Sequence, residues 1–221
     1  MEESRKTLSN LVFKRLLRKG GVLRTRTEVN DLLATITQDF LAKILRACII
    51  VVTQGKKTMR PEHLEIACRT MGINMAVGVS PTATVTPSLV TGSTYPRRKA
   101  ASGEKPKRKF KQGTVSTREV KFQQSRDKLV FRKAAFAKYC KWLILESGEI
   151  KVYAKEINLQ SLNCSKVLFA QLQVLCERYI IALAASAWSL AVASNQKTLN
   201  AGHISSVIKI NEKCRAFYAV R

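Results

Sequence analysis

Two octapeptides, KTMRPEHL at residues 57–64 and KTLNAGHI at residues 197–204, share the skeleton Lys-Thr-x-x-x-x-His-apolar. The only two histidines of the chain, His63 and His203, occupy the same position in both. The chain has 221 residues, which is enough for one large domain or two small ones with cores of their own. A motif that returns near the end of such a chain favours two related units.

The residues around the first octapeptide predict a short helix, a long helix and another short helix. Ser9 or Asn10 can cap a helix over residues 11–19. Apolar residues then recur at three-and-four spacing from Thr27 until Gly55, which predicts one helix of about seven turns. The last helix begins at Pro61, which suits a first helical turn, and ends before Gly72.

The same plan returns around the second octapeptide, with one additional helix in front of it. In chain order the pattern predicts an extra helix over 115–125, a helix over 132–146, an irregular stretch over 148–162, a second long helix capped by Asn163 or Ser165, and a short helix from Ala201. The predicted domains are a tail over 1–9, a first unit over 10–76, a linker over 77–112 and a second unit over 113–221.

The linker contains four of the five prolines and then the basic run RRKAASGEKPKRKFK at residues 97–111. This composition predicts a flexible segment whose basic end can lie along phosphates. A charge run that only improves solubility is the alternative.

A long helix between two short ones cannot cover its own apolar face, so the two units are expected to pair in one all-α fold. Antiparallel crossing of the long helices would bring the first loop of each unit beside the second loop of the other. It would place Arg24 and Arg26 beside Lys197 and Thr198, and residues 56–58 beside the loop that ends at Asn163. The short first helices would add a third basic site.

The charge of the chain predicts a polyanionic partner. There are 39 Lys and Arg residues against 15 Asp and Glu residues, which leaves a formal charge of +24 and a pI near 10.2. No catalytic set of Ser, His and Asp, no paired acids and no phosphate-binding glycine loop is recognisable, so an enzyme is not expected.

Three other features limit the class of protein. The six cysteines form no CxxC pair, which favours buried thiols in a reducing compartment over a metal or disulfide role. The N-terminus does not resemble a secretory signal. Residues 179–196 carry no charge, and their Ala and Ser content favours a buried helix over a membrane span.

Several stretches resemble the core histones. VFKRLLRKGGVLR (12–24) and KKTMRPEHLEIA (56–67) are similar to histone four, whereas KFKQGTVSTREVKFQQSRDKLVFRKAAF (109–136) and CERY (176–179) are similar to histone three. The order of the two resembles the fused histone doublets of giant DNA viruses of the marseillevirus type. The resemblance implies two histone folds paired as an intramolecular handshake pseudo-heterodimer.

The resemblance also implies a function and partners. The expected function is DNA packaging in a nucleosome-like particle, through the DNA backbone and minor groove and without sequence specificity. The expected partners are double-stranded DNA, a second copy of the chain and a second doublet resembling the other two core histones. No metal or cofactor is implied, and the expected location is the virion and viral factory, or the host nucleus. A protein-interaction subunit of a transcription or replication complex is the alternative.

The residues implied in these roles form three sets. The DNA-binding set is Lys14, Arg15, Arg18, Lys19, Arg24, Arg26, Lys56, Lys57, Thr58, Lys111, Arg118, Lys121, Arg132, Lys133, Lys197 and Thr198. The self-association set is Leu190, Ala193, Ser194, His203 and Val207, and the set for docking the partner doublet is Val51, Gln54, Ile66 and Cys68.

The chain departs from the family pattern at several positions. The family pairs a second-loop arginine with an aspartate at the place of the two histidines, whereas here the second loops have Lys56 and Gln196. Asn163 stands where histone three places a minor-groove arginine, after an apparent insertion. The histidines are expected to be surface or interface residues that replace the lost pairs, and His203 to make a pH-sensitive contact.

Overall fold

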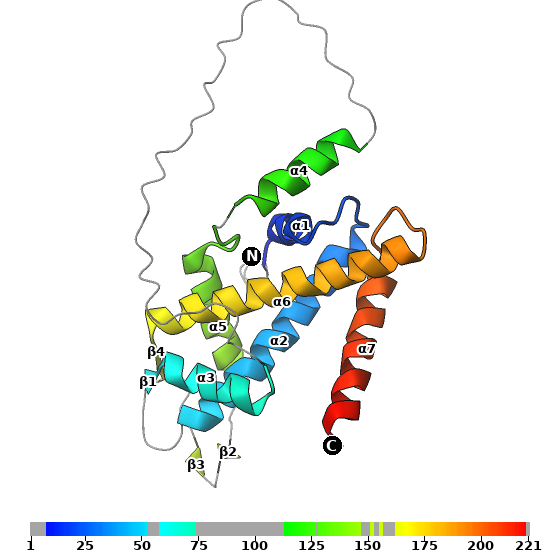
Figure 1. The fold of residues 1–221 in the computed structure, drawn as a ribbon. Helices are drawn as coiled ribbons and strands as arrows, with labels where there is room; N and C mark the ends of the chain where they lie inside the picture. Colours follow the sequence, from blue (N-terminus) through cyan, green and yellow to red (C-terminus); the bar gives the residue numbers. More distant parts are fainter. Residues whose placement is uncertain are drawn as a thin grey trace, which may run out of the picture.

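A computed structural model describes residues 8–52, 58–73, 113–126, 128–146, 151–152, 155–156 and 162–219. The described residues are mostly helical (Figure 1). The helices are α1 (Asn10–Lys19), α2 (Glu28–Val52), α3 (Pro61–Thr70), α4 (Thr114–Gln124), α5 (Lys133–Glu146), α6 (Lys166–Ala193) and α7 (Ala201–Ala219). Four two-residue strands accompany them: β1 (Thr58–Met59), β2 (Lys151–Val152), β3 (Lys155–Glu156) and β4 (Asn163–Cys164).

These helices confirm the predicted all-α class and the order of elements. Two details differ from the prediction. The last helix is not short, because α7 has 19 residues, and the stretch predicted as irregular contains the antiparallel pair of β2 and β3. Ser165 is the cap of α6, since its hydroxyl accepts a hydrogen bond from the Val167 N–H at 3.3 Å, while Asn163 lies in β4. The predicted linker lies outside the described residues.

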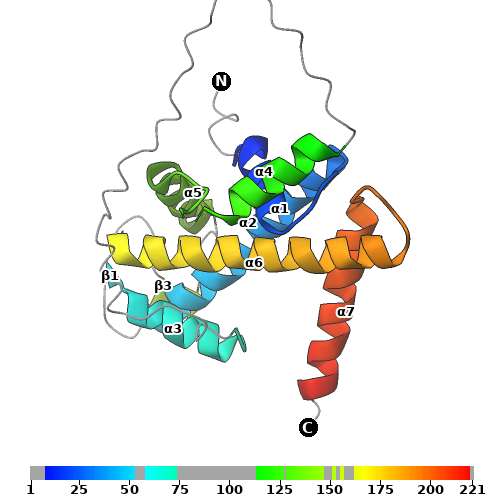
Figure 2. The ribbon, with the colours of Figure 1, turned by 45° about the horizontal axis from the view of Figure 1, so that its top comes forward.

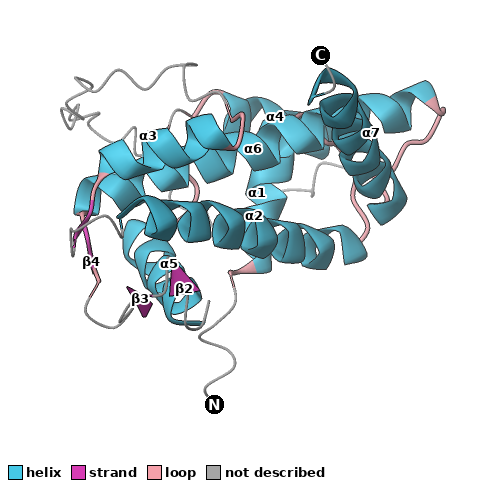
Figure 3. Ribbon diagram, turned by 90° about the horizontal axis from the view of Figure 1, so that it is seen from below, coloured by secondary structure: helices cyan, strands magenta, loops and turns pink. Residues whose placement is uncertain are grey.

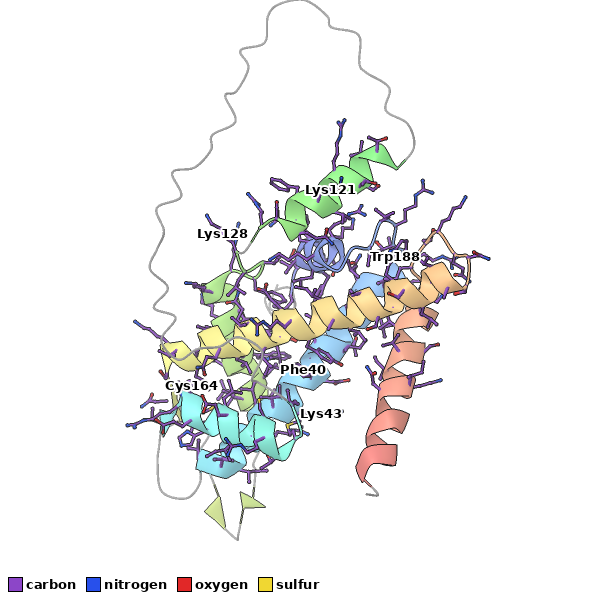
Figure 4. The ribbon with its side chains drawn as sticks, viewed as in Figure 1. Phe40, Lys43, Lys121, Lys128, Cys164 and Trp188 are labelled. Atoms are coloured by element: carbon purple, nitrogen blue, oxygen red, sulfur yellow. The ribbon has the colours of Figure 1, made fainter. Side chains whose placement is uncertain are left out.

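The two long helices cross in the centre of the molecule, and Figure 3 shows β2, β3 and β4 at one end and α7 at the other. Phe40 of α2 stacks on Tyr179 of α6, with ring centroids 4.1 Å apart and planes 4° apart. Phe40 lies where the two ribbons pass one another (Figure 4). Leu41, Ile44 and Ile180 are fully buried in the same cluster, so each long helix covers the apolar face of the other.

By length and composition, α6 is apolar enough to cross a membrane. Half of its most apolar stretch of 18 residues is buried inside the protein. It packs against α1, α5 and α7 as well as α2. Its inner face also holds two buried polar residues, Gln173 and Glu177. These contacts are those of a core helix, as the sequence predicted.

Helix α1 approaches α6 closely at Gly20. A Cβ atom on Gly20 would lie 2.9 Å from the Ala184 Cβ and 3.2 Å from the Ile181 carbonyl oxygen. Glycine is required there because a side chain has no room. The backbone conformation is not the reason, since a φ of −71° suits any residue. The next residue, Gly21, has a φ of +87°, which is a left-handed conformation that favours glycine and turns the chain away from α1.

Candidate nucleic-acid interface

The first loop pair lies where the start of α2 meets the end of α6. Thr25 and Leu199 form a parallel β-bridge. The Leu199 N–H donates to the Arg24 carbonyl at 2.8 Å, and the Arg26 N–H donates to the Leu199 carbonyl at 3.2 Å. These bonds confirm the predicted approach of the two loops. They also place the exposed side chains of Arg24, Arg26 and Lys197 at one end of the molecule.

A basic groove continues from this loop pair between α1 and α4. Its volume is about 870 Å³, and it is lined by residues of both helices, of the first loop and of the second octapeptide. Figure 2 shows α4 lying across α1 on one side of α6. Four basic residues and one acid line the groove: Lys14, Arg15, Arg18, Arg24 and Glu119. Such a lining attracts an anion.

The Arg18 side chain is occupied by interactions within the protein. Its Nη1 donates to the carbonyls of Val22, at 2.8 Å, and Leu23, and its Nε lies 3.2 Å from a Glu119 carboxylate oxygen. Lys19 is similarly engaged, because its Nζ donates to the Lys128 carbonyl at 2.9 Å. The side chains of Lys14 and Arg15 on the same helix are exposed. Of the predicted DNA-binding residues on α1, these two are therefore the most available.

The second loop pair lies at the opposite ends of the long helices. Strands β1 and β4 run parallel, with Thr58 opposite Asn163 and Met59 opposite Cys164. The Ser165 N–H adds a bond to the Met59 carbonyl at 3.0 Å. Thr58 thus lies beside the loop ending at Asn163, as predicted, and its side chain is half-buried. Lys56, Lys57 and Gln54 lie outside the described residues.

The start of α5 is held against α6 by a buried carboxylate. Glu177, which is 2% exposed, accepts hydrogen bonds from the Val130 N–H at 2.9 Å and the Phe131 N–H at 3.0 Å. Gln173 donates to the same carboxylate at 3.0 Å and to the Phe131 carbonyl at 2.9 Å. This anchor positions the exposed Arg132 and Lys133, the predicted basic residues at this end of α5.

The sequence prediction did not identify this anchor. Two polar residues one turn apart on the apolar face of a long helix are the signal that could have found it. Phe131 also meets Phe13 of α1 edge-on, with ring centroids 6.2 Å apart. The basic ends of α1 and α5 are thereby brought to the same side of the molecule.

Other predicted DNA-binding residues lie on or near α4. Arg118 and Lys121 are exposed on this helix, and Lys121 and Lys128 lie on the side of the molecule that carries α1 and α4 (Figure 4). Thr198 is half-buried and lines the groove. Lys111 lies outside the described residues.

The repeated histidine has a local structural role in both units. His63 Nδ1 accepts a hydrogen bond from the Arg60 N–H at 2.9 Å, and His203 Nδ1 accepts one from the Asn200 N–H at 3.2 Å. Each imidazole thus caps the start of its helix from the third helical position, where a capping box usually has Glu or Gln. His63 is 8% exposed and not a surface residue, whereas His203 is half-buried.

The residues predicted to contact other chains differ in exposure. In the self-association set, Ala193 and Ser194 are exposed, Leu190 is half-buried and Val207 is 7% exposed. In the docking set, Ile66 is 45% exposed, Val51 is half-buried and Cys68 is fully buried. Val207 and Cys68 therefore support these surfaces from inside and do not present a side chain to a partner.

Five cysteines are free thiols: Cys48, Cys68, Cys140 and Cys176, which are buried, and Cys164, which is half-buried. Burial raises the pKa of Cys68 to about 11, and burial together with the neighbouring Cys68 raises the pKa of Cys48 to about 12. Such thiols stay protonated near neutral pH and are poor nucleophiles. Within the described part of the chain, no group of three or more His, Cys, Asp or Glu residues could hold a metal ion.

No protein-family model matches the sequence, and no curated protein is significantly similar to it.

Proposed function

We propose that this chain is a DNA-packaging histone doublet, with two histone folds paired within one molecule. The observation that carries the proposal is the first loop pair. Backbone hydrogen bonds between segments about 175 residues apart hold Arg24, Arg26 and Lys197 together beside a basic groove. Exposed cations on a hydrogen-bonded backbone, together with half-buried hydroxyls, suit contacts to a phosphate backbone, which has the same geometry in every sequence.

The distance between the two loop pairs supports a series of contacts along one duplex. With 25 residues, α2 is about 37 Å long at 1.5 Å per residue, and the loop pairs lie at its two ends. The cations of α1 and of the start of α5 supply further contacts. Neutralising phosphates on one side of a duplex favours bending it toward the protein.

The proposal includes partners and a location. A second copy would pair through the exposed end of α6, near Ala193 and Ser194, with His203 at the margin. A second doublet would dock at the surface that includes Ile66, and Ile50 is also exposed. The chain would act in the virion and viral factory, or in the host nucleus.

Nuclease digestion of random-sequence DNA assembled with the protein tests the proposal, with and without a candidate partner doublet. Discrete protected fragments are expected, and a longer fragment in the presence of the partner. A smear at every protein-to-DNA ratio would contradict a defined particle. It would favour the alternative, a protein-interaction subunit, for which the exposed apolar side chains of Ile50 and Ile66 would be the contact surface.

A further inference from the structure

The two loop pairs can be aligned with each other through the repeated octapeptides. Leu199 and Met59 are both the third residue of the octapeptide. Leu199 is bridged to Thr25, and Met59 is paired with Cys164, in both cases in parallel. Thr25 and Cys164 are therefore equivalent positions. The residues that flank them can then be compared one by one.

An arginine and an asparagine have exchanged strands between the two loop pairs. In the first pair, Arg24 precedes the bridged residue on one strand, and Asn200 follows it on the other. In the second pair, Asn163 occupies the position of Arg24, and Arg60 occupies the position of Asn200. Each loop pair thus has one arginine and one asparagine in these two positions.

Arg60 has the exposure that this comparison requires. Its side chain is exposed, as is that of Arg24. The backbone N–H of Arg60 donates the capping hydrogen bond to His63 Nδ1, and its guanidinium takes no part in this bond. Within the part of the chain that the structure describes, Arg60 takes part in no ion pair, so no described carboxylate neutralises it.

We propose that Arg60 is the phosphate-contacting arginine of the second loop pair and takes the place left by Asn163. This inference rests on the proposed function. Neighbouring paired strands lie only about 4.8 Å apart. A flexible arginine side chain can cover that separation, so the guanidinium can reach the same phosphates from either strand. Arginine also suits the role because its fork of donors matches phosphate geometry. Lys166, exposed two residues beyond Cys164, adds charge to the same end.

The test compares three variants of the full chain: Arg60→Ala, Arg24→Ala and the control Arg69→Ala. Arg69 is an exposed arginine in the last turn of α3, the helix that Arg60 precedes. The control therefore removes the same charge and leaves the loop pair intact. The measurement is the affinity for a random-sequence duplex at several salt concentrations. Thermal melting of each variant excludes a folding defect.

Arg60→Ala and Arg24→Ala should each lower the slope of log K against log salt by about one, and the affinity at 0.1 M salt by about five- to tenfold. Arg69→Ala should change both by much less. If Arg24→Ala weakens binding while Arg60→Ala matches the control, this inference is wrong and the proposed function stands. If none of the three changes the slope, the proposed function itself fails.

A second-site change tests the equivalence of the two positions. Asn163→Arg in the Arg60→Ala background returns the arginine to the position that Arg24 has in the first pair. It should restore the salt slope of the unmodified protein. A double variant that binds as weakly as Arg60→Ala alone would overturn the exchange.

Discussion

The buried carboxylate of Glu177 accepts hydrogen bonds from three groups, and Glu177→Ala measures its contribution to stability. The substitution removes the acceptor of the Val130 and Phe131 N–H groups and of the Gln173 amide. A buried donor left without an acceptor costs about 1–3 kcal/mol. Two backbone N–H groups left without an acceptor therefore cost about 2–6 kcal/mol. Removing a buried charge offsets part of this cost. We expect a net loss of about 3 kcal/mol in the free energy of unfolding.

Glu177→Gln separates the charge from the shape of the side chain. The amide oxygen, in the place of Oε1, can still accept from Phe131 and Gln173, but as a neutral group. The NH2 that replaces Oε2 cannot accept from the Val130 N–H. Hydrogen bonds to charged groups contribute about 1.5–3 kcal/mol against about 1 kcal/mol for neutral ones. The expected loss is therefore smaller than for alanine, about 1–2 kcal/mol.

Urea unfolding at equilibrium measures both losses, and amide hydrogen exchange at Val130 and Phe131 localises them. Glu65→Gln, at an exposed position of α3, is the matched control and should change stability by less than about 0.5 kcal/mol. The reasoning fails if Glu177→Ala costs less than about 1 kcal/mol, or if the glutamine variant is as unstable as the alanine variant.

Three further predictions concern packing, titration and capping. Gly20→Ala should lower stability by about 1–3 kcal/mol, seen as a lower Tm, because the new Cβ would press on the backbone of α6; an unchanged Tm would refute the close contact. Stability should be full below pH 9 and fall as the pH rises toward 11, since the unfolded chain ionises its thiols near pH 9 while the buried Cys68, with a pKa of about 11, remains protonated. The free energy of unfolding in urea, measured at pH 8 and at pH 10.5, checks this. Cys68→Ala should lose less stability between the two pH values than the unmodified protein; an equal loss in both proteins would count against the prediction. His203→Ala should cost about 1 kcal/mol and His203→Gln much less, because glutamine at the third helical position can still accept from the Asn200 N–H; equal melting temperatures for the two variants would contradict the capping role.

The helices could be predicted from the sequence because their signals are local. The spacing of apolar residues from Thr27 to Val52 predicts α2, and Pro61 predicts the first turn of α3. The meeting of the loops followed from one further argument, that a long helix between two short ones needs the other unit to cover its apolar face, with the long helices crossing antiparallel. It predicted which loops meet, and the Thr25–Leu199 bridge confirms it.

The roles of individual polar side chains could not be predicted in the same way, because they depend on where distant backbone groups lie. Arg18 carries a positive charge in any reading of the sequence, but only the fold brings Glu119 and the carbonyl of Val22 to it. The histidines were expected to replace a lost ionic pair. In the structure each accepts from its own helix, three residues back. A capping box is recognised in a sequence by Glu or Gln at the third helical position. Histidine at that position was therefore not recognised as a cap.

The repeat explains why the arginine can lie on one segment in the first loop pair and on the other segment in the second, with the same fold in both. Each loop pair is held by backbone hydrogen bonds, and each following helix is started by a histidine that accepts from the backbone. None of these bonds uses the side chains of Arg24, Asn163 or Arg60. Those positions are therefore free to differ between the two units, provided that each end of the long helices keeps an exposed cation. The proposed contact with DNA requires charge at each end, and each loop pair permits that charge on either of its two paired segments.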